Sequence, residues 1–140
     1  MSKTFLILLL GSLGAWSAAK AQDVVLVANK TVQISGITDA DLRAIFTGKK
    51  TRFADGSHAV PVILKGGAAH EVFLKNHLGE GPEEFRAQWR KLVFTGQGAM
   101  PISFNTESAL LAYVAVTPGA VGYVSRFSSQ DGVRAVDTLK

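Results

Sequence analysis

The sequence contains no cysteine among its 140 residues. Without a thiol, the chain has no disulfide, no thiolate nucleophile and no cysteine-ligated metal site, and it lacks the N-terminal cysteine that carries a lipid anchor. The fold must therefore be stable without covalent cross-links. A domain of more than about 100 residues achieves this, because it removes well over half of its chain surface from water.

Long apolar runs are also scarce. The longest, Phe5–Trp16, is shorter than the roughly 20 residues that a membrane span requires. It follows Lys3 and precedes Ala19-Lys20-Ala21, where small residues stand at both positions that a signal peptidase reads. The pattern predicts a cleavable secretory signal over residues 1–21 and an exported domain over residues 22–140, with no stable membrane insertion once the signal is removed. An uncleaved anchor is the alternative.

A surplus of charge of one sign is missing as well. The chain has 15 Lys and Arg against 11 Asp and Glu, and without Lys3 and Lys20 the basic count falls to 13. No basic run is longer than Lys49-Lys50. Nucleic-acid-binding domains carry a larger and more clustered positive charge, so we expect no nucleic acid as a partner.

Catalytic motifs are absent from the sequence. There is no Gly-x-Ser-x-Gly elbow, P-loop or dinucleotide fingerprint, and Thr95–Gly98 follows an expected helix instead of a strand. His70 and His77 lie two helical turns apart, about 10 Å along the axis, which is too far for one metal ion. We therefore expect no enzyme, no metal and no cofactor. His70 alone stands where a histidine can donate an N–H to a bound anion, in the first turn behind a glycine pair.

What the sequence does contain is a strand, turn and helix around Gly66 and Gly67. Val60–Leu64 is an apolar run typical of a strand buried on both faces, and a helix is expected over residues 68–78. The unpaired N–H groups at a helix start carry partial positive charge, and Lys65 lies beside them. The turn is therefore a candidate anion site, with a plain strand-to-helix connection as the alternative.

The rest of the chain continues to alternate between strand and helix patterns. Strands are expected over residues 23–29 and 120–124, with an edge strand over 133–139, and helices over 38–48, from Pro82 to near Gly96, and from Asn105 or Thr106 onward. This alternation predicts one α/β domain. We expect a three-layer sandwich with a mixed, mostly parallel sheet flanked by helices.

Two segments add a family resemblance. The first is Leu42-x-x-Ile45-Phe46-x-Gly48-Lys49, followed by Phe53 and by Val60-Pro61-Val62 leading into the glycine turn. The second is Thr117–Val124, which is similar to a closing Pro-Gly-Ala-Ile-Gly-Tyr-Val segment. Together they resemble the C-terminal lobe of phosphate-binding proteins of ABC transporters, over roughly residues 23–125.

The resemblance implies a type 2 periplasmic-binding-protein-like domain that is periplasmic, non-enzymatic and linked to an ABC-type uptake system. It implies phosphate or another small oxyanion as the ligand, and a membrane transporter or envelope protein as a partner. The chain has length for a single lobe. The expected binding residues are those of the turn and of the following helix start: Lys65, Gly66, Gly67, Ala68, Ala69, Asn105 and Thr106.

The turn departs from the family pattern in one respect. The family usually has Arg-x-x-Gly-Ser-Gly-Thr here, whose hydroxyls bind phosphate, whereas this chain has Lys65 to Ala69 without a hydroxyl. A domain that keeps the fold, binds no ligand and serves as an interaction module of the cell envelope is therefore the alternative function.

Overall fold

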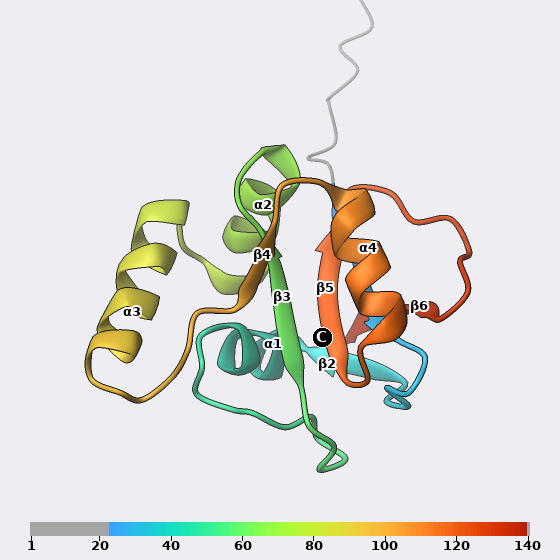
Figure 1. Ribbon diagram of the computed structural model, residues 1–140, viewed down its shortest axis with the longest axis horizontal. Helices are drawn as coiled ribbons and strands as arrows, with labels where there is room; N and C mark the ends of the chain where they lie inside the picture. The colour runs from blue at the N-terminus through green and yellow to red at the C-terminus, as the bar shows by residue number, and fades with distance from the viewer. Residues whose placement is uncertain (1–22, 140) are drawn as a thin grey trace, which may run out of the picture.

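The computed structural model describes residues 23–139, which form a six-stranded sheet with helices on both faces (Figure 1). The signal sequence predicted over residues 1–21 lies outside the described residues. The elements in chain order are β1 (Val25–Asn29), β2 (Gly36–Thr38), α1 (Asp39–Phe46), β3 (Val60–Leu64), α2 (Ala68–Phe73), the π-helical turn η1 (Leu74–Leu78), α3 (Pro82–Phe94), β4 (Ile102–Phe104), α4 (Glu107–Val116), β5 (Ala120–Val124) and β6 (Val133–Leu139).

The sheet is mixed and mostly parallel, as predicted. Its strand order is β2-β6-β1-β5-β3-β4. β3 runs parallel to both β4 and β5, and β2 runs parallel to β6. β1 is antiparallel to its two neighbours, β5 and β6, so that among the six described strands it alone is reversed. The carboxyl ends of β3, β4 and β5 consequently lie at the same edge of the sheet.

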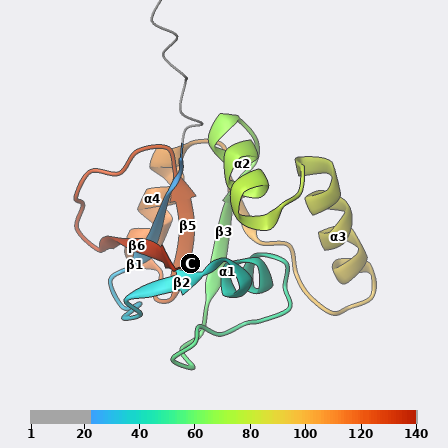
Figure 2. The same ribbon diagram turned by 180° about the vertical axis from the view of Figure 1, so that it is seen from behind.

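Helices cover the sheet on both faces and confirm the three-layer arrangement. α4 packs against β1, β5 and β3 on one face, whereas α1 and α2 lie on the other face, as the two opposite views agree (Figures 1 and 2). The centre of this second layer is aromatic. Phe73 stacks on Tyr123 with ring centroids 3.9 Å apart, and Phe46 meets Phe73 edge-on at 4.9 Å. Such pairs add to the free energy of burial because of their ring geometry.

The local helix signals of the sequence are confirmed. Thr38 caps α1 by accepting a hydrogen bond from the N–H of Asp41, and Gly48 ends that segment with a φ of 81°. Pro82 takes the first position of α3. Thr106 caps α4 by accepting from the N–H of Ala109. Each of these signals acts within one helical turn, so it operates whatever the tertiary fold.

The position of the last strand was predicted wrongly. β6 is an interior strand that lies between β2 and β1, instead of an edge strand. The reason is β2, a three-residue strand just before α1 that was not predicted, which adds to the outer side of β6 from Gly36 to Thr38. Val133–Val136 of β6 pairs with β1, and Asp137–Leu139 pairs with β2, so the two parts of the strand have partners on opposite sides.

The helix expected over residues 68–78 is divided in two. α2 ends at Phe73, and the chain then widens into η1, where the N–H of Gly79 reaches back to the carbonyl of Leu74. Gly79 ends the segment with a φ of 69°.

α3 lies beyond β4, at one end of the molecule (Figure 1). Phe85 and Trp89 are its buried residues, and the indole N–H of Trp89 donates to the carbonyl of Phe46 at 2.9 Å. This bond fixes α3 to α1. No helix within residues 23–139 is both long and apolar enough to cross a bilayer.

Candidate functional site

The predicted site residues meet at the carboxyl edge of the parallel strands. β3 and β4 pair in register up to Leu64 and Phe104, and the N–H of Lys65 donates to the carbonyl of Phe104 at 2.9 Å. Lys65 therefore lies beside Asn105 and Thr106, although 40 residues separate them in the sequence. The structure brings both halves of the predicted site together.

The glycine turn after β3 is open to solvent. Residues 65–68 are exposed, and Gly67 has a φ of 93°, a value that glycine adopts without strain. Within the described residues, no acceptor bonds the N–H groups of Gly66, Gly67, Ala68 or Ala69. These donors therefore have no partner within the described residues, at a turn that is largely exposed. The helix behind them, α2, has only six residues, so its dipole adds little.

The start of α4 contributes a hydroxyl group that can donate a hydrogen bond and a carboxylate that carries negative charge. The Thr106 hydroxyl accepts from the N–H of Ala109 at 3.1 Å, which leaves its own proton free to be donated. The Glu107 carboxylate accepts from the N–H of Ser125, and from the Ser125 hydroxyl at 2.9 Å. Glu107 thus closes the end of β5 with a negative charge. The exposed Arg126 follows Ser125 and brings a cation to the same edge.

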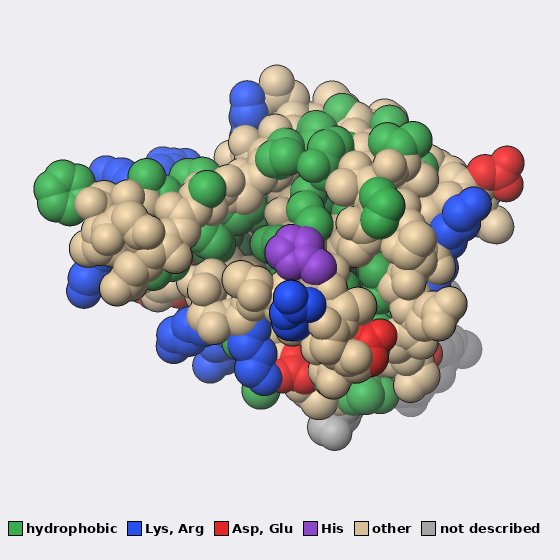
Figure 3. All heavy atoms as spheres, turned by 60° about the horizontal axis from the view of Figure 1, so that its bottom comes forward, with side chains coloured by type: hydrophobic (Ala, Val, Ile, Leu, Met, Phe, Trp, Pro, Cys, Tyr) green, Lys and Arg blue, Asp and Glu red, His purple; other side chains and the backbone are tan. Residues whose placement is uncertain are grey.

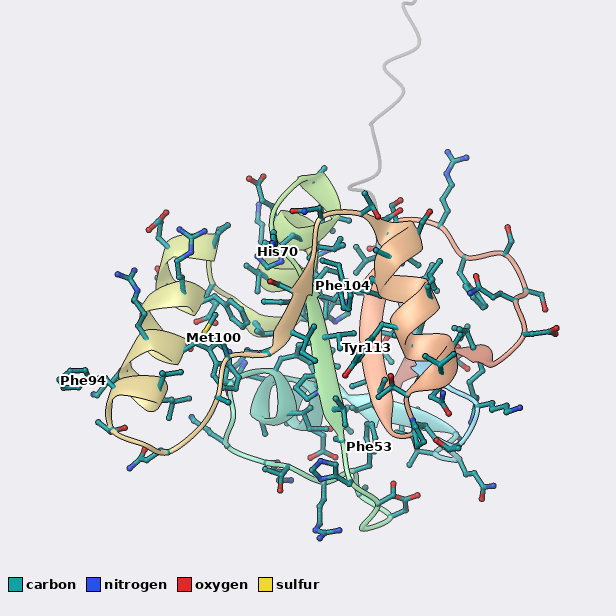
Figure 4. All side chains as sticks on the ribbon, viewed as in Figure 1. Phe53, His70, Phe94, Met100, Phe104 and Tyr113 are labelled. Carbon is teal, nitrogen blue, oxygen red and sulfur yellow. The ribbon has the colours of Figure 1, made fainter. Side chains whose placement is uncertain are left out.

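A pocket of about 280 Å³ lies beneath this edge, on the face of the sheet that carries α2. Its lining comes from β3, α2, α3 and β4, and includes Lys65, His70, Phe85, Arg86 and Ser103. Figure 4 shows His70 and Met100, two of its lining residues, on the side of β4 that faces α3. Lys65 lines both the pocket and the open turn.

His70 is the buried polar side chain of this pocket, with only 4% of its surface exposed. The Tyr123 hydroxyl accepts from the N–H of Leu64 at 3.0 Å and lies 2.5 Å from Nδ1 of His70. Because its proton has no other acceptor within the described residues, we assign the hydroxyl as the donor to Nδ1. The imidazole is then the tautomer with hydrogen on Nε2. Burial, followed by the nearby charge of Arg86, lowers the pKa of His70, and the side chain is neutral at pH 7.

Sequence reasoning identified His70 but missed Arg86, Ser103, Tyr123 and Arg126. Arg86 is one of several charged residues of α3, and Ser103 lies in a three-residue strand, so neither belongs to a recognisable motif. Tyr123 is 53 residues from the histidine it bonds. Only the fold reveals these partners.

The remaining histidines do not form a metal site. His77 Nδ1 lies 2.9 Å from the Asp39 carboxylate, joining η1 to α1, and His58 is exposed in the loop before β3. Within residues 23–139 there is no group of three His, Cys, Asp or Glu side chains that could hold a metal ion.

Comparison with known proteins shows which solved structures share this architecture. No family model matches the chain. Among solved structures, an ABC-type phosphate transport receptor from Vibrio cholerae superposes with a TM-score of 0.61 at 16% identity, over 82% of this chain and 45% of its own length. A phosphate ABC transporter substrate-binding protein from Clostridium perfringens, solved with bound phosphate, gives 0.63 at 20% identity, over 82% and 44%. PstS from Borrelia burgdorferi gives 0.59 at 12% identity, over 82% and 46%.

At these identities the similarity is one of fold, and the chain spans less than half the length of the structures it matches. The resemblance inferred from Leu42–Lys49 and Thr117–Val124 is confirmed at that level. The chain has the fold of part of the phosphate-binding proteins of ABC transporters.

Proposed function

We propose that this chain is a solute-binding domain that holds phosphate or a related small oxyanion at the carboxyl edge of β3 and β4. The observation that carries the proposal is the hydrogen bond from the N–H of Lys65 to the carbonyl of Phe104, because it gathers a cation, unpaired N–H groups of the turn and the polar side chains of Asn105 and Thr106 at one place. In open α/β sheets, ligands bind at the carboxyl ends of the strands. The shared fold with phosphate-binding proteins supports the same conclusion.

The expected affinity is weak. The turn is exposed, its alanines supply no hydroxyl, and exposed charges contribute only up to about 1 kcal/mol each. Glu107 opposes a fully ionised anion at the same edge. A dissociation constant of about 1 mM, equivalent to roughly 4 kcal/mol, suits such a site. A second lobe supplied by another copy or by a partner protein would raise the affinity by closing the site.

Export and transport complete the proposal. A signal peptide over residues 1–21 would deliver the domain to the periplasm, and an ABC-type uptake system would be the transporter it serves. The neighbours in structure are transport proteins, which favours a non-enzymatic role for this chain.

The test is calorimetry and thermal unfolding with inorganic phosphate, sulfate and acetate at low salt. Binding shifts the melting temperature by mass action. Lys65→Gln and Asn105→Ala are each expected to weaken phosphate binding about two- to five-fold, the effect of losing one exposed polar contact. The matched control is Lys30→Gln, which removes one exposed cation at the end of the reversed strand β1, on the opposite edge of the sheet.

Two results would contradict the proposal. One is the absence of heat and of any thermal shift at about 10 mM anion, ten times the expected dissociation constant. The other is an equal loss of binding in Lys30→Gln and Lys65→Gln, because it would indicate attraction by net charge and not a site.

A second candidate, an interaction module of the cell envelope, is favoured by the apolar surface at the end of α3. Phe94 is 93% exposed and points away from the body (Figure 4). Val93 and Met100 are also exposed, and they line the same surface hollow as Phe94. Figure 3 shows hydrophobic, Lys and Arg side chains together at this end of the molecule. A photoreactive residue at position 94 is expected to cross-link to one envelope protein in cells, and Phe94→Ser to leave the melting temperature unchanged while reducing that protein's co-purification. A protein that cross-links to nothing specific contradicts this candidate.

A further inference from the structure

The pocket beneath the carboxyl edge has its own set of hydrogen-bond donors, separate from the turn amides. His70 supplies Nε2–H, since its Nδ1 is engaged by Tyr123. Within the described residues, the one fully enclosed side-chain polar atom without a partner is Glu80 Oε1. Nε2 of His70 has no hydrogen-bond partner among the described residues, yet it is not one of these fully enclosed atoms. It is therefore accessible from the pocket that His70 lines. A nine-tenths buried donor thus opens into a cavity.

The other polar lining groups are donors as well. Ser103 pairs with Ile63, which also lines the pocket, whereas its neighbour Phe104 turns to the opposite face and packs on Tyr113. Arg86 comes from the first turns of α3, where it also contacts the Glu83 carboxylate at 3.4 Å. Together with Lys65 these groups provide two cations, one imidazole N–H and one hydroxyl. No carboxylate is among the lining residues.

The remaining lining is apolar and too large for an inorganic ion alone. Leu64, Pro82, Phe85 and Met100 form much of the wall. Inorganic phosphate takes the room of about three water molecules, roughly 90 Å³. The pocket volume of about 280 Å³ leaves space beside it for a compact apolar group.

We propose that this pocket binds a small organic anion, a carboxylate or a phosphate monoester with a compact apolar body. The anionic head lies among His70 Nε2–H, the Ser103 hydroxyl, Arg86 and Lys65, and the body lies against Phe85 and Met100. Pockets of this kind combine apolar walls with a few convergent polar groups. This inference does not rest on the phosphate-binding function proposed above, although Lys65 lines both sites.

The experiment titrates the protein with phenyl phosphate and, separately, with inorganic phosphate, and follows the heat and the NMR signals of the His70 imidazole. Phenyl phosphate is expected to bind at least about ten-fold more tightly than inorganic phosphate, because its ring fills apolar space. It is also expected to shift the His70 Nε2–H signal. Arg86→Gln is expected to weaken phenyl phosphate binding about five- to ten-fold, and Ser103→Ala about three-fold. His70 is observed and not replaced, because its substitution also breaks the bond to Tyr123.

The matched control is Arg90→Gln, one turn further along α3, which removes the same charge outside this pocket. It is expected to leave phenyl phosphate binding unchanged. Benzyl alcohol, which has the ring without the anion, is expected to bind at least ten-fold more weakly than phenyl phosphate. Equal losses in Arg86→Gln and Arg90→Gln, an unmoved His70 signal, or equally tight binding of benzyl alcohol would each overturn the proposal.

The two proposed sites are separated by Asn105→Ala. This variant is expected to weaken inorganic phosphate binding and to leave phenyl phosphate binding intact, whereas Arg86→Gln does the reverse. If the wild-type protein binds phenyl phosphate but not inorganic phosphate, the proposal of the carboxyl-edge site is contradicted and the proposal of the pocket is not. If it binds inorganic phosphate but not phenyl phosphate, the proposal of the pocket is contradicted and that of the carboxyl-edge site is not.

Discussion

Tyr123 connects the sheet to the layer formed by α1 and α2 through several contacts. Its ring is fully buried and stacks on Phe73, and its hydroxyl bonds both the N–H of Leu64 and Nδ1 of His70. Burial raises the pKa of Tyr123, so the hydroxyl keeps its proton at neutral pH and can donate it to His70. One side chain thereby links β5, β3 and α2.

The first prediction at this scale concerns that hydroxyl. Tyr123→Phe is expected to lower the free energy of unfolding by about 1–3 kcal/mol, because a buried N–H and a buried imidazole nitrogen lose their partner. Tyr113→Phe is the control, since the Tyr113 hydroxyl makes no hydrogen bond within the described residues. It is expected to change the free energy by no more than about 0.5 kcal/mol. Urea unfolding of both variants measures the difference, and similar losses would contradict the role given to Tyr123.

The second prediction concerns the protonation of His70. Its pKa in the folded chain lies below the ordinary value of 6.5, which the unfolded chain retains, so the unfolded state binds more protons as the pH falls below 6.5. The contribution of His70 to stability is therefore lost on acidification through this window, and is unaffected at higher pH. An NMR titration is expected to give a His70 midpoint below 6.5, and Arg86→Gln to move it upward. A midpoint at or above 6.5 in the wild type would contradict the assignment of a buried, neutral imidazole.

At the scale of elements, the turn between α4 and β5 leaves no room for a side chain at Gly119. Gly119 has a φ of 78°, and a Cβ at this position would lie 2.4 Å from the carbonyl oxygen of His58. The turn must pass this close because the N–H of Val60 donates to the carbonyl of Gly119, which begins the pairing of β3 with β5.

The third prediction separates conformational strain from this close contact. Gly56 also has a positive φ, 86°, but a Cβ there meets nothing within 4 Å. Gly56→Ala is expected to cost about 1–2 kcal/mol from the left-handed backbone alone. Gly119→Ala is expected to cost at least about 2 kcal/mol more, since backbone must move to relieve the contact. Urea unfolding compares them, and equal costs would show that the turn at Gly119 relaxes freely.

Element by element, the sequence predicted what is local and missed what is distant. Thr38, Pro82 and Thr106 signal helix starts within one turn, and α1, α3 and α4 begin where they indicate. The interior position of β6 in the sheet depends on its pairing with β2, about 100 residues earlier, and no pattern inside Val133–Leu139 predicts that pairing. The candidate site shows the same difference. Local patterns predicted the glycine turn, Asn105 and Thr106 as site residues, whereas the pocket that Arg86 and Ser103 line depends on distant contacts and was not predicted.

At the scale of the whole molecule, the sheet joins the two ends of the described chain. β1, the first strand, lies between β5 and β6, the last two strands, and β6 in turn carries β2. The strands that bear the candidate site, β3 and β4, are attached through β5. The site therefore depends on pairing that involves both ends.

The fourth prediction follows from the interior position of β6. A chain ending at Gln130 lacks β6 entirely, so β1 loses one neighbour and β2 loses the one strand it pairs with among the described residues. It is expected to show no cooperative unfolding transition. A chain ending at Val136 keeps the pairing with β1 and loses that with β2, and is expected to unfold cooperatively at a lower urea concentration than the full chain. Circular dichroism measures the unfolding of each chain. A cooperative transition in the chain that ends at Gln130 would contradict the interior role of β6.

The placement of β1 between β5 and β6 also bears on when the chain can fold during its synthesis. β1, the first of the described strands, has no strand partner until the chain has been made beyond Ala120, because its neighbours begin at Ala120 and Val133. Contacts so far apart in sequence form slowly. A nascent chain of this topology therefore cannot complete the pairing of β1 before β5 and β6 have been synthesised.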